Sequence, residues 1–267
     1  MFSFLKTNKF DSKEAVDIIE DIVYQYLKPL GFKKYGPTLH RFVDGDISQI
    51  VNFQNGCPQK EIYNVLWVNL GIRVPECVER KFVISQPLKK YYHEYECNIR
   101  TRLGAFVDNT EAGHSLKGDP YRTGRTIVEK LEKHVLPVFD VLNSRQAILE
   151  NRRNYRAFDE MNHHLILLEE AMIYGRKGDR ETAGELFREY YQEQIKEHQY
   201  ASEHGDQICL PKGASVMYRN AKTEQTETIV ANKGGYATLY HFNTGHLEYL
   251  EALAEELDIV LGEKENS

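Results

Sequence analysis

The sequence predicts an α+β fold: an antiparallel sheet with an N-terminal helix packed on it, a helical hairpin, and a small C-terminal unit of strands plus one helix. Apolar residues recur every three or four positions over residues 11–30, alternate with polar ones over 66–74, and return to helical spacing over 159–197. The 267 residues, 41% of them hydrophobic, suffice for one large domain or two. We expect the family-like α+β domain at 1–150, the helical hairpin at 151–204 and the small C-terminal β-plus-helix unit at 205–267.

The first helix is expected from about Asp11 to Leu30. Asp11 followed by Glu14 forms a capping box, and Gly31 stands where a helix end favours a left-handed residue. The stripe that this helix would bury consists of Ala15, Ile18, Ile19, Ile22, Tyr26, Leu27 and Leu30.

Three strands are expected next. Thr38–Val43 and Ile47–Gln54 are joined by Asp44-Gly45, which predicts a tight turn. Tyr63–Val74 is the clearest strand, because its even-numbered positions from Leu66 onward are all apolar.

A fourth strand is predicted for Glu94–Phe106, where two sets of side chains alternate. The stretch before it, Pro75–Tyr92, carries no periodicity that assigns it to a helix or a strand. Asp119-Pro120 is typical of an N-cap followed by a first-turn proline, and Pro137 predicts a kink in the helix that follows.

The second half is expected to contain two helices and then a small sheet. The helices are broken at Lys177-Gly178-Asp179. Strand-like segments follow at Ser215–Arg219, Thr226–Ala231 and Tyr236–Phe242, with residues 232–235 turning the last two, and His246–Leu261 closes the chain as a helix.

Composition and charge exclude several classes of protein. A net charge of −6 makes nucleic-acid binding unlikely, because such proteins usually carry a basic surface. Four scattered cysteines do not make a disulfide framework, and no segment is apolar enough for a signal peptide or a membrane span. We therefore expect a cytoplasmic protein that does not enter the membrane.

No motif predicts a catalytic residue, a metal site or a cofactor. The nearest phosphate-loop pattern, Gly118–Thr126, has one residue too many between its glycines, and Pro120 removes a backbone donor. His93 and Cys97 have helical spacing inside a segment that looks extended, so they do not predict a metal site.

The strongest candidate for function is a polar sheet face. If the strand at 63–74 pairs antiparallel with the one at 94–106, their non-core side chains share a face. The candidate binding residues are Gln54, Trp67, Asn69, Arg73, Asn98, Arg100 and Arg102. Three arginines would attract a phosphate, a carboxylate or an acidic surface, and Trp67 could anchor a contact. The alternative is an ordinary solvated face whose arginines pair with carboxylates of the chain.

Two functions remain open from these residues. The first is a non-catalytic module that binds a protein partner, of which an immunity protein is one form by analogy. The second is an enzyme or sensor for a phosphorylated or carboxylated small molecule, held in a pocket over the same face. Whether the protein is an enzyme, and its oligomeric state, are not determined by the sequence.

The N-terminal half resembles the bacterial proteins grouped as domain-of-unknown-function family 4304. The segments that carry the resemblance are Leu27–Lys34, Ile50–Gln54, Val68–Ile72 and Arg102-Leu103-Gly104. The resemblance covers the first 110 to 150 residues and implies a helix against an antiparallel sheet. It implies no activity, and Gln54 and Asn69 match recurrent polar positions of the family.

Overall fold

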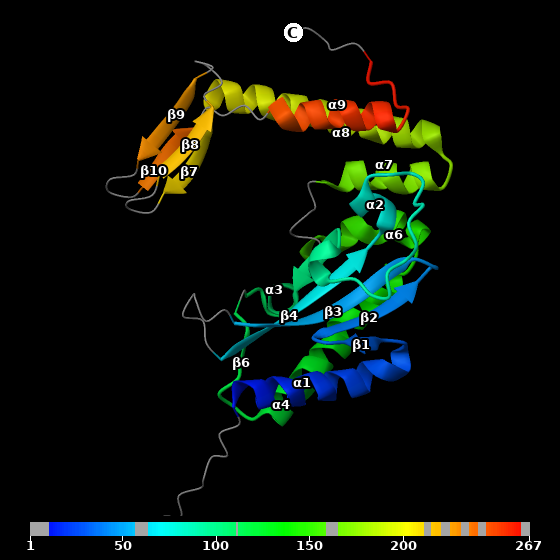
Figure 1. The fold of residues 1–267 in the computed structure, drawn as a ribbon, viewed down its shortest axis with the longest axis vertical. Coiled ribbons are helices and arrows are strands. Elements are labelled where there is room, and N and C mark those ends of the chain that lie inside the picture. Colours follow the sequence, from blue (N-terminus) through cyan, green and yellow to red (C-terminus); the bar gives the residue numbers. More distant parts are fainter. Residues whose placement is uncertain are drawn as a thin grey trace, which may run out of the picture. The chain divides into compact units, whose positions relative to one another are not determined.

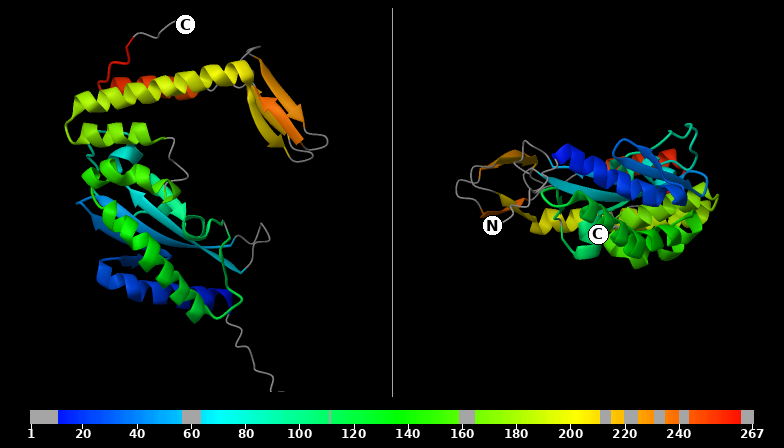
Figure 2. Two further views of the ribbon diagram at one scale, coloured as in Figure 1. Left: turned by 180° about the vertical axis from the view of Figure 1, so that it is seen from behind. Right: turned by 90° about the horizontal axis from the view of Figure 1, so that it is seen from below.

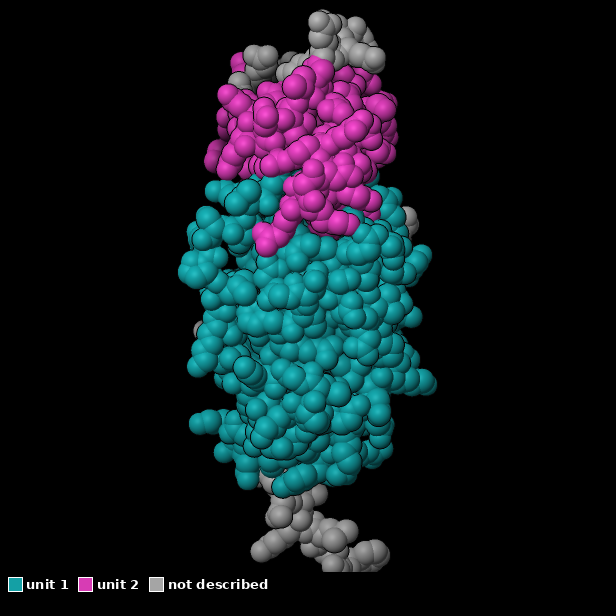
Figure 3. All heavy atoms as spheres, turned by 90° about the vertical axis from the view of Figure 1, so that its right-hand side faces the viewer, with its two compact units in different colours: residues 1–169 teal, residues 170–267 magenta. Residues whose placement is uncertain are grey.

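The chain is divided into two compact units, residues 1–169 and 170–267 (Figure 3). The computed structural model describes residues 11–56, 64–110, 112–158, 165–210, 215–219, 225–230, 235–239 and 244–262. The α+β class predicted from the sequence is confirmed, with the N-terminal helix, the antiparallel sheet and the C-terminal strands and helix all present.

Unit 1 contains a six-stranded antiparallel sheet in which β1 to β5 follow one another in sequence order and β6 pairs with β4 (Figure 1). The strands are β1 (Lys33–Tyr35), β2 (Thr38–Val43), β3 (Ile47–Asn55), β4 (Val65–Arg73), β5 (Ile99–Arg102) and β6 (His114–Ser115). The turn predicted between β2 and β3 is present, with Asp44 and Gly45 at φ values of 46° and 79°. Each residue of this turn is therefore in the left-handed region that a tight hairpin requires.

The helices α1 and α4 lie side by side against one face of this sheet (Figures 1 and 2). Unit 1 contains α1 (Ser12–Leu27), α2 (Pro75–Glu79), α3 (Leu103–Asp108), α4 (Pro120–Lys130), α5 (Leu136–Val141) and α6 (Arg145–Asn151). The predicted cap of α1 is formed, because the Asp11 carboxylate accepts a hydrogen bond from the Glu14 backbone at 2.8 Å. Leu39, Val51 and Leu70 are fully buried on the sheet face that these helices cover.

The helix that contains Pro137 is irregular, as predicted. It changes to a π-helical turn over Leu131–Val135 before α5 begins. Pro137 has no backbone N–H to donate, so regular α-helical hydrogen bonding cannot continue through it.

The fourth strand is much shorter than predicted, and the expectation of a strand over residues 94–106 was wrong at both ends. Glu94–Glu96 form a 3₁₀ helix, and α3 begins directly after β5 at Leu103. The Glu96 carboxylate accepts a hydrogen bond from the His93 backbone at 2.8 Å, which closes a capping box in place of a strand ladder. The alternating polarity over residues 94–106 therefore corresponds to a strand of only four residues, β5.

Unit 2 begins inside α7 (Ile166–Arg176) and continues with α8 (Arg180–His204) and α9 (Thr244–Glu256). The predicted break between the first two helices is present, with Gly178 at a φ of 90° and the Asp179 carboxylate accepting from the Thr182 backbone. The strands of this unit are β7 (Asp206–Leu210), β8 (Ser215–Arg219), β9 (Thr226–Val230) and β10 (Gly235–Leu239).

The pairing of these strands differs from the prediction. β9 pairs with β8, and β10 pairs with β7, a strand that the sequence had not indicated. Of the turn predicted at residues 232–235, Gly235 is the first residue of β10, and the other three lie outside the described residues. Among the helices that the structure describes, none has the length and hydrophobicity needed to cross a bilayer.

Candidate binding site

Six of the seven candidate residues share one face of the sheet. In the pairing of β4 with β5, Asn69 lies opposite Arg102, and Gly71 lies opposite Arg100. In the pairing of β3 with β4, Gln54 lies opposite Trp67. Directly opposed residues point to the same side of a sheet. We call the side that carries Gln54, Trp67, Asn69, Gly71, Arg73, Arg100 and Arg102 the polar face.

The polar face is partly covered by residues 74–98, which we call the covering segment. The Tyr92 ring lies 4.0 Å from the guanidinium carbon of Arg73, and Tyr92 and Cys97 form a buried cluster with Ile50. A Cβ atom placed on Gly71 would lie 2.6 Å from the Cys97 sulfur, so glycine permits this close approach. The part of the polar face that carries Arg73 is therefore interior rather than solvated.

Each of the three arginines has its own partner in the chain. Arg73 Nη2 donates to Glu79 Oε1 at 2.8 Å, and Arg100 Nε donates to Glu94 Oε1 at 2.7 Å. The Arg102 guanidinium carbon lies 5.5 Å from the centre of the Trp67 ring, within the range of a cation–π contact. Ion pairing within the chain, the alternative to a shared anion site, is thus present at Arg100 and at one nitrogen of Arg73.

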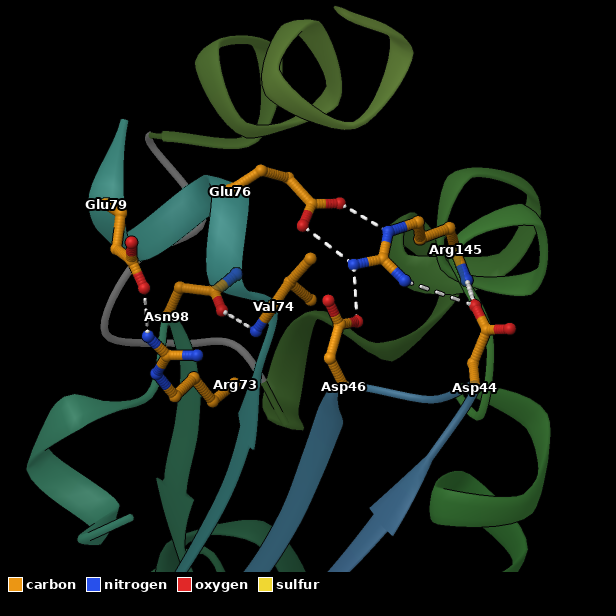
Figure 4. A network of polar contacts seen from close by, with 8 residues as sticks. All are labelled: Asp44, Asp46, Arg73, Val74, Glu76, Glu79, Asn98 and Arg145. Carbon is orange, nitrogen blue, oxygen red and sulfur yellow. Dashed lines mark hydrogen bonds and ion pairs between the residues drawn. The ribbon is translucent and has the colours of Figure 1, made fainter. Parts of the chain in front are cut away.

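The amides of the polar face hold the strands together. Asn69 Nδ2 donates to Gln54 Oε1 at 3.0 Å, and Asn52 Nδ2 donates to Thr38 Oγ1 at 3.0 Å. Asn98, the seventh candidate, accepts from the Val74 backbone at 2.8 Å (Figure 4). It also donates to Glu169 Oε2 at 2.8 Å. Since Asn98 is buried and fixes the end of β4, its contacts are structural.

The short helix α2 is held by a network of ion pairs centred on Arg145 (Figure 4). Arg145 binds both carboxylate oxygens of the fully buried Glu76, at 2.6 and 2.9 Å, and also Asp46 at 2.6 Å. Burial alone would lower the pKa of Arg145, but the hydrogen bonds to Glu76 and Asp46 raise it above its ordinary value. This network fixes the start of the covering segment to the β2–β3 turn and to α6.

A cavity of about 400 Å³ lies within the covering segment, between α2 and the residues that follow it up to Glu96. Its apolar wall is formed by Pro75, Val78, Val83, Ile84, Pro87 and Leu88. Its charged side chains are Arg73, Lys81, Lys89, Glu79 and Glu96. The lining thus combines apolar and polar side chains in comparable measure, so that an apolar wall lies beside groups that could orient a ligand.

Two of the three cations of the cavity, Arg73 and Lys89, lie over the ring of Tyr92. The Lys89 ammonium lies 5.5 Å from the centre of the ring on which Arg73 is stacked, and it also pairs with Glu96 at 2.6 Å. This hydrogen bond to Glu96 raises the pKa of Lys89. Arg73 is only 4% exposed. Its Nε and Nη1 are buried and have no hydrogen-bond partner among the described residues. Buried N–H groups without partners are rare and call for an explanation.

The thiols of Cys77 and Cys97 are buried. Burial raises the pKa of Cys97 and of Cys77 well above the ordinary value. The Cys97 sulfur donates to the His93 carbonyl oxygen at 3.8 Å, a contact within a local turn. No group of three histidine, cysteine, aspartate or glutamate side chains that could hold a metal ion occurs among the described residues.

Arg73 is the one residue of the cavity lining that was predicted from the sequence as a candidate. Most of the other lining residues lie between Val78 and Glu96, within the stretch that had no helical or strand periodicity. The signal in the sequence was indirect: Pro75–Tyr92 has no helical or strand period. In the structure, the fourteen residues 80–93 lie in neither helix nor strand. Ordered loops of this length are uncommon and often functional.

A comparison with known protein families found a match for the part of the chain that carries this site. Residues 23–141 match the family model of the domain of unknown function DUF4304. The matched region includes the sheet, the covering segment, all seven candidate residues and the whole cavity. The resemblance inferred from the sequence is thereby confirmed. No curated protein and no solved structure matches the chain.

Proposed function

We propose that this protein is a non-catalytic module that binds a partner protein through the exposed apolar side chains of the covering segment, three of which also line the cavity. The observation that carries the proposal is a concentration of exposed apolar side chains there. Of the twelve large hydrophobic residues that are exposed in the described structure, Val78, Val83, Leu88 and Tyr95 fall within 18 positions. Clustered apolar side chains on a surface are typical of protein interfaces.

The chemistry of the surrounding side chains also favours a protein partner. Tyr95 is 67% exposed and stacks on His93, whose ring contacts Tyr91. Tyr91 in turn stacks on Tyr35 of the sheet at 4.7 Å. Aromatic rings that are already held in place lose little conformational entropy on binding, and they are enriched at interfaces. We place this interaction inside the cell, since Cys77 and Cys97 are free thiols, the form that a reducing compartment maintains.

Affinity capture with matched variants tests the proposal. The tagged protein is used to capture partners from a lysate of its own cells, which are identified by mass spectrometry, and the affinity of each for the variants is then measured. Leu88→Asp should weaken binding by about tenfold or more, because the charge would be desolvated in an apolar interface. Leu30→Asp is the matched control, since Leu30 is 41% exposed and Leu88 is 45% exposed.

A partner lost with Leu88→Asp and retained with Leu30→Asp supports the proposal. The absence of any stoichiometric partner, or a partner that is insensitive to Leu88→Asp, contradicts it. The second function, a sensor or enzyme for a small phosphorylated or carboxylated molecule, is supported by the cavity and would then take precedence.

A further inference from the structure

We propose that the cavity beside α2 binds a carboxylate that carries a short apolar group. The carboxylate would bind Arg73, and the apolar group would pack against Val83 and Leu88. This inference does not depend on the existence of a protein partner.

The guanidinium of Arg73 has unused binding capacity. It offers five N–H donors, of which one is engaged by Glu79 at 2.8 Å. Nε and Nη1, which lie on different edges of the group, have no partner among the described residues. Hydrogen bonds from a charged donor to a carboxylate are among the strongest in proteins, so an anion would gain from these donors.

Access to Arg73 requires the exchange of one carboxylate for another. Arg73 is nearly buried, but the side chain of its partner Glu79 is 28% exposed and lines the same cavity. An incoming carboxylate can therefore displace Glu79 from Nη2, after which Glu79 is hydrated at the surface. Glu79 acts in this scheme as a competitor that occupies the site in the absence of ligand.

The charge and lining of the cavity favour a carboxylate over a phosphate. Its three cations, Arg73, Lys81 and Lys89, stand against the two carboxylates Glu79 and Glu96. This small positive excess suits a single negative charge, whereas a phosphate would bring up to two beside those carboxylates. Val83 and Leu88 on the same wall suit an apolar substituent.

The test follows the Nε–Hε resonance of Arg73 by NMR in the full-length protein, assigned by its loss in Arg73→Gln. The probes are butyrate, acetyl-leucine, acetyl-leucine amide and inorganic phosphate, at millimolar concentrations and constant ionic strength. Butyrate represents a free small acid, acetyl-leucine represents the C-terminus of a polypeptide, and the amide is its neutral control. The site predicts a saturable shift with butyrate or acetyl-leucine and none with the amide.

Two variants make the result decisive. Glu79→Gln removes the competitor's charge and should tighten carboxylate binding by about threefold to tenfold. Arg73→Lys keeps a cation in case Arg73→Gln does not fold, and its binding is followed through the backbone amide resonances of the covering segment. It should weaken binding by about tenfold, since lysine lacks the guanidinium geometry. Arg100→Gln, which removes a paired arginine from outside the cavity, should leave the affinity unchanged.

The inference is overturned if neither carboxylate shifts the Arg73 resonance, if phosphate binds more tightly than both, or if Glu79→Gln weakens binding. A response to butyrate alone supports a free acid as the ligand, and a stronger response to acetyl-leucine supports a chain terminus. If Leu88→Asp leaves partner binding unchanged while a carboxylate shifts the Arg73 resonance, the proposed function is refuted and the carboxylate site stands.

Discussion

The two faces of the sheet in unit 1 are buried by different means. On one face, Leu66, Leu70 and Ile72 are fully buried under helices, and their side chains are wholly apolar. On the polar face, an irregular segment covers Arg73 and His40, which are 4% and 2% exposed. His40 Nε2, Ser48 Oγ and two nitrogens of Arg73 are buried there without hydrogen-bond partners among the described residues.

This difference distinguishes the face that stabilises the fold from the face whose polar groups are available for binding. An apolar face gains free energy from every buried methylene, whereas buried polar atoms without partners cost free energy. Such atoms persist where the surrounding structure or a ligand compensates for that cost. The helix-covered face thus serves mainly for stability, and the polar face is the place to look for function.

The largest expected effect is a loss of stability, which differs between neighbouring residues on opposite faces of the sheet. Leu70→Ala should lower the free energy of unfolding by about 3 kcal/mol, because it leaves a cavity among buried helices and strands. Asn69→Ala should cost only about 1 kcal/mol, since the half-buried Asn52 and exposed Gln54 can turn to water. Urea unfolding monitored by circular dichroism measures both changes. Equal losses would show that the covered polar face stabilises the fold as strongly as the apolar face.

The second prediction concerns pH and His40. Burial and the nearby Lys33 lower the pKa of His40 to about 4, from an ordinary value of 6.5. The unfolded chain therefore binds a proton at a higher pH than the folded protein, so stability should fall as the pH drops from 6.5 towards 4. The loss attributable to His40 is at most about 3 kcal/mol. His40→Gln should remove this component of the pH dependence in urea unfolding. An unchanged slope in the variant would mean that the covering segment does not keep His40 neutral.

The third prediction concerns the contact between the covering segment and the sheet. Gly71→Ala should destabilise the protein by about 2 kcal/mol, because the added methyl group meets Cys97. Gly118→Ala is the control, since a Cβ at that position has no neighbour within 4 Å. A double-mutant cycle with Cys97→Gly should recover about 1 kcal/mol of the loss. Additive losses in the cycle would place the strain elsewhere than at Cys97.

The sequence by itself determined the elements whose side chains repeat at a regular spacing. α1 with its Asp11 cap, β2, β3, β4 and the break at Gly178 all lie where predicted, because helical and strand periods are properties of a local stretch. The alternation along β4 also assigned Trp67, Asn69 and Arg73 to one face, and the register with β3 and β5 confirms it.

Only the tertiary structure decided what covers that face and which groups pair across it. The covering segment has no period, and it is held by contacts between residues that are distant in sequence, such as Glu76 with Arg145 and Asn98 with Glu169. The same holds for the pairing of β7 with β10, which closes a sheet over some 25 intervening residues. Contacts of this kind depend on the shape of the whole unit, and a local pattern of residue types carries no information about them.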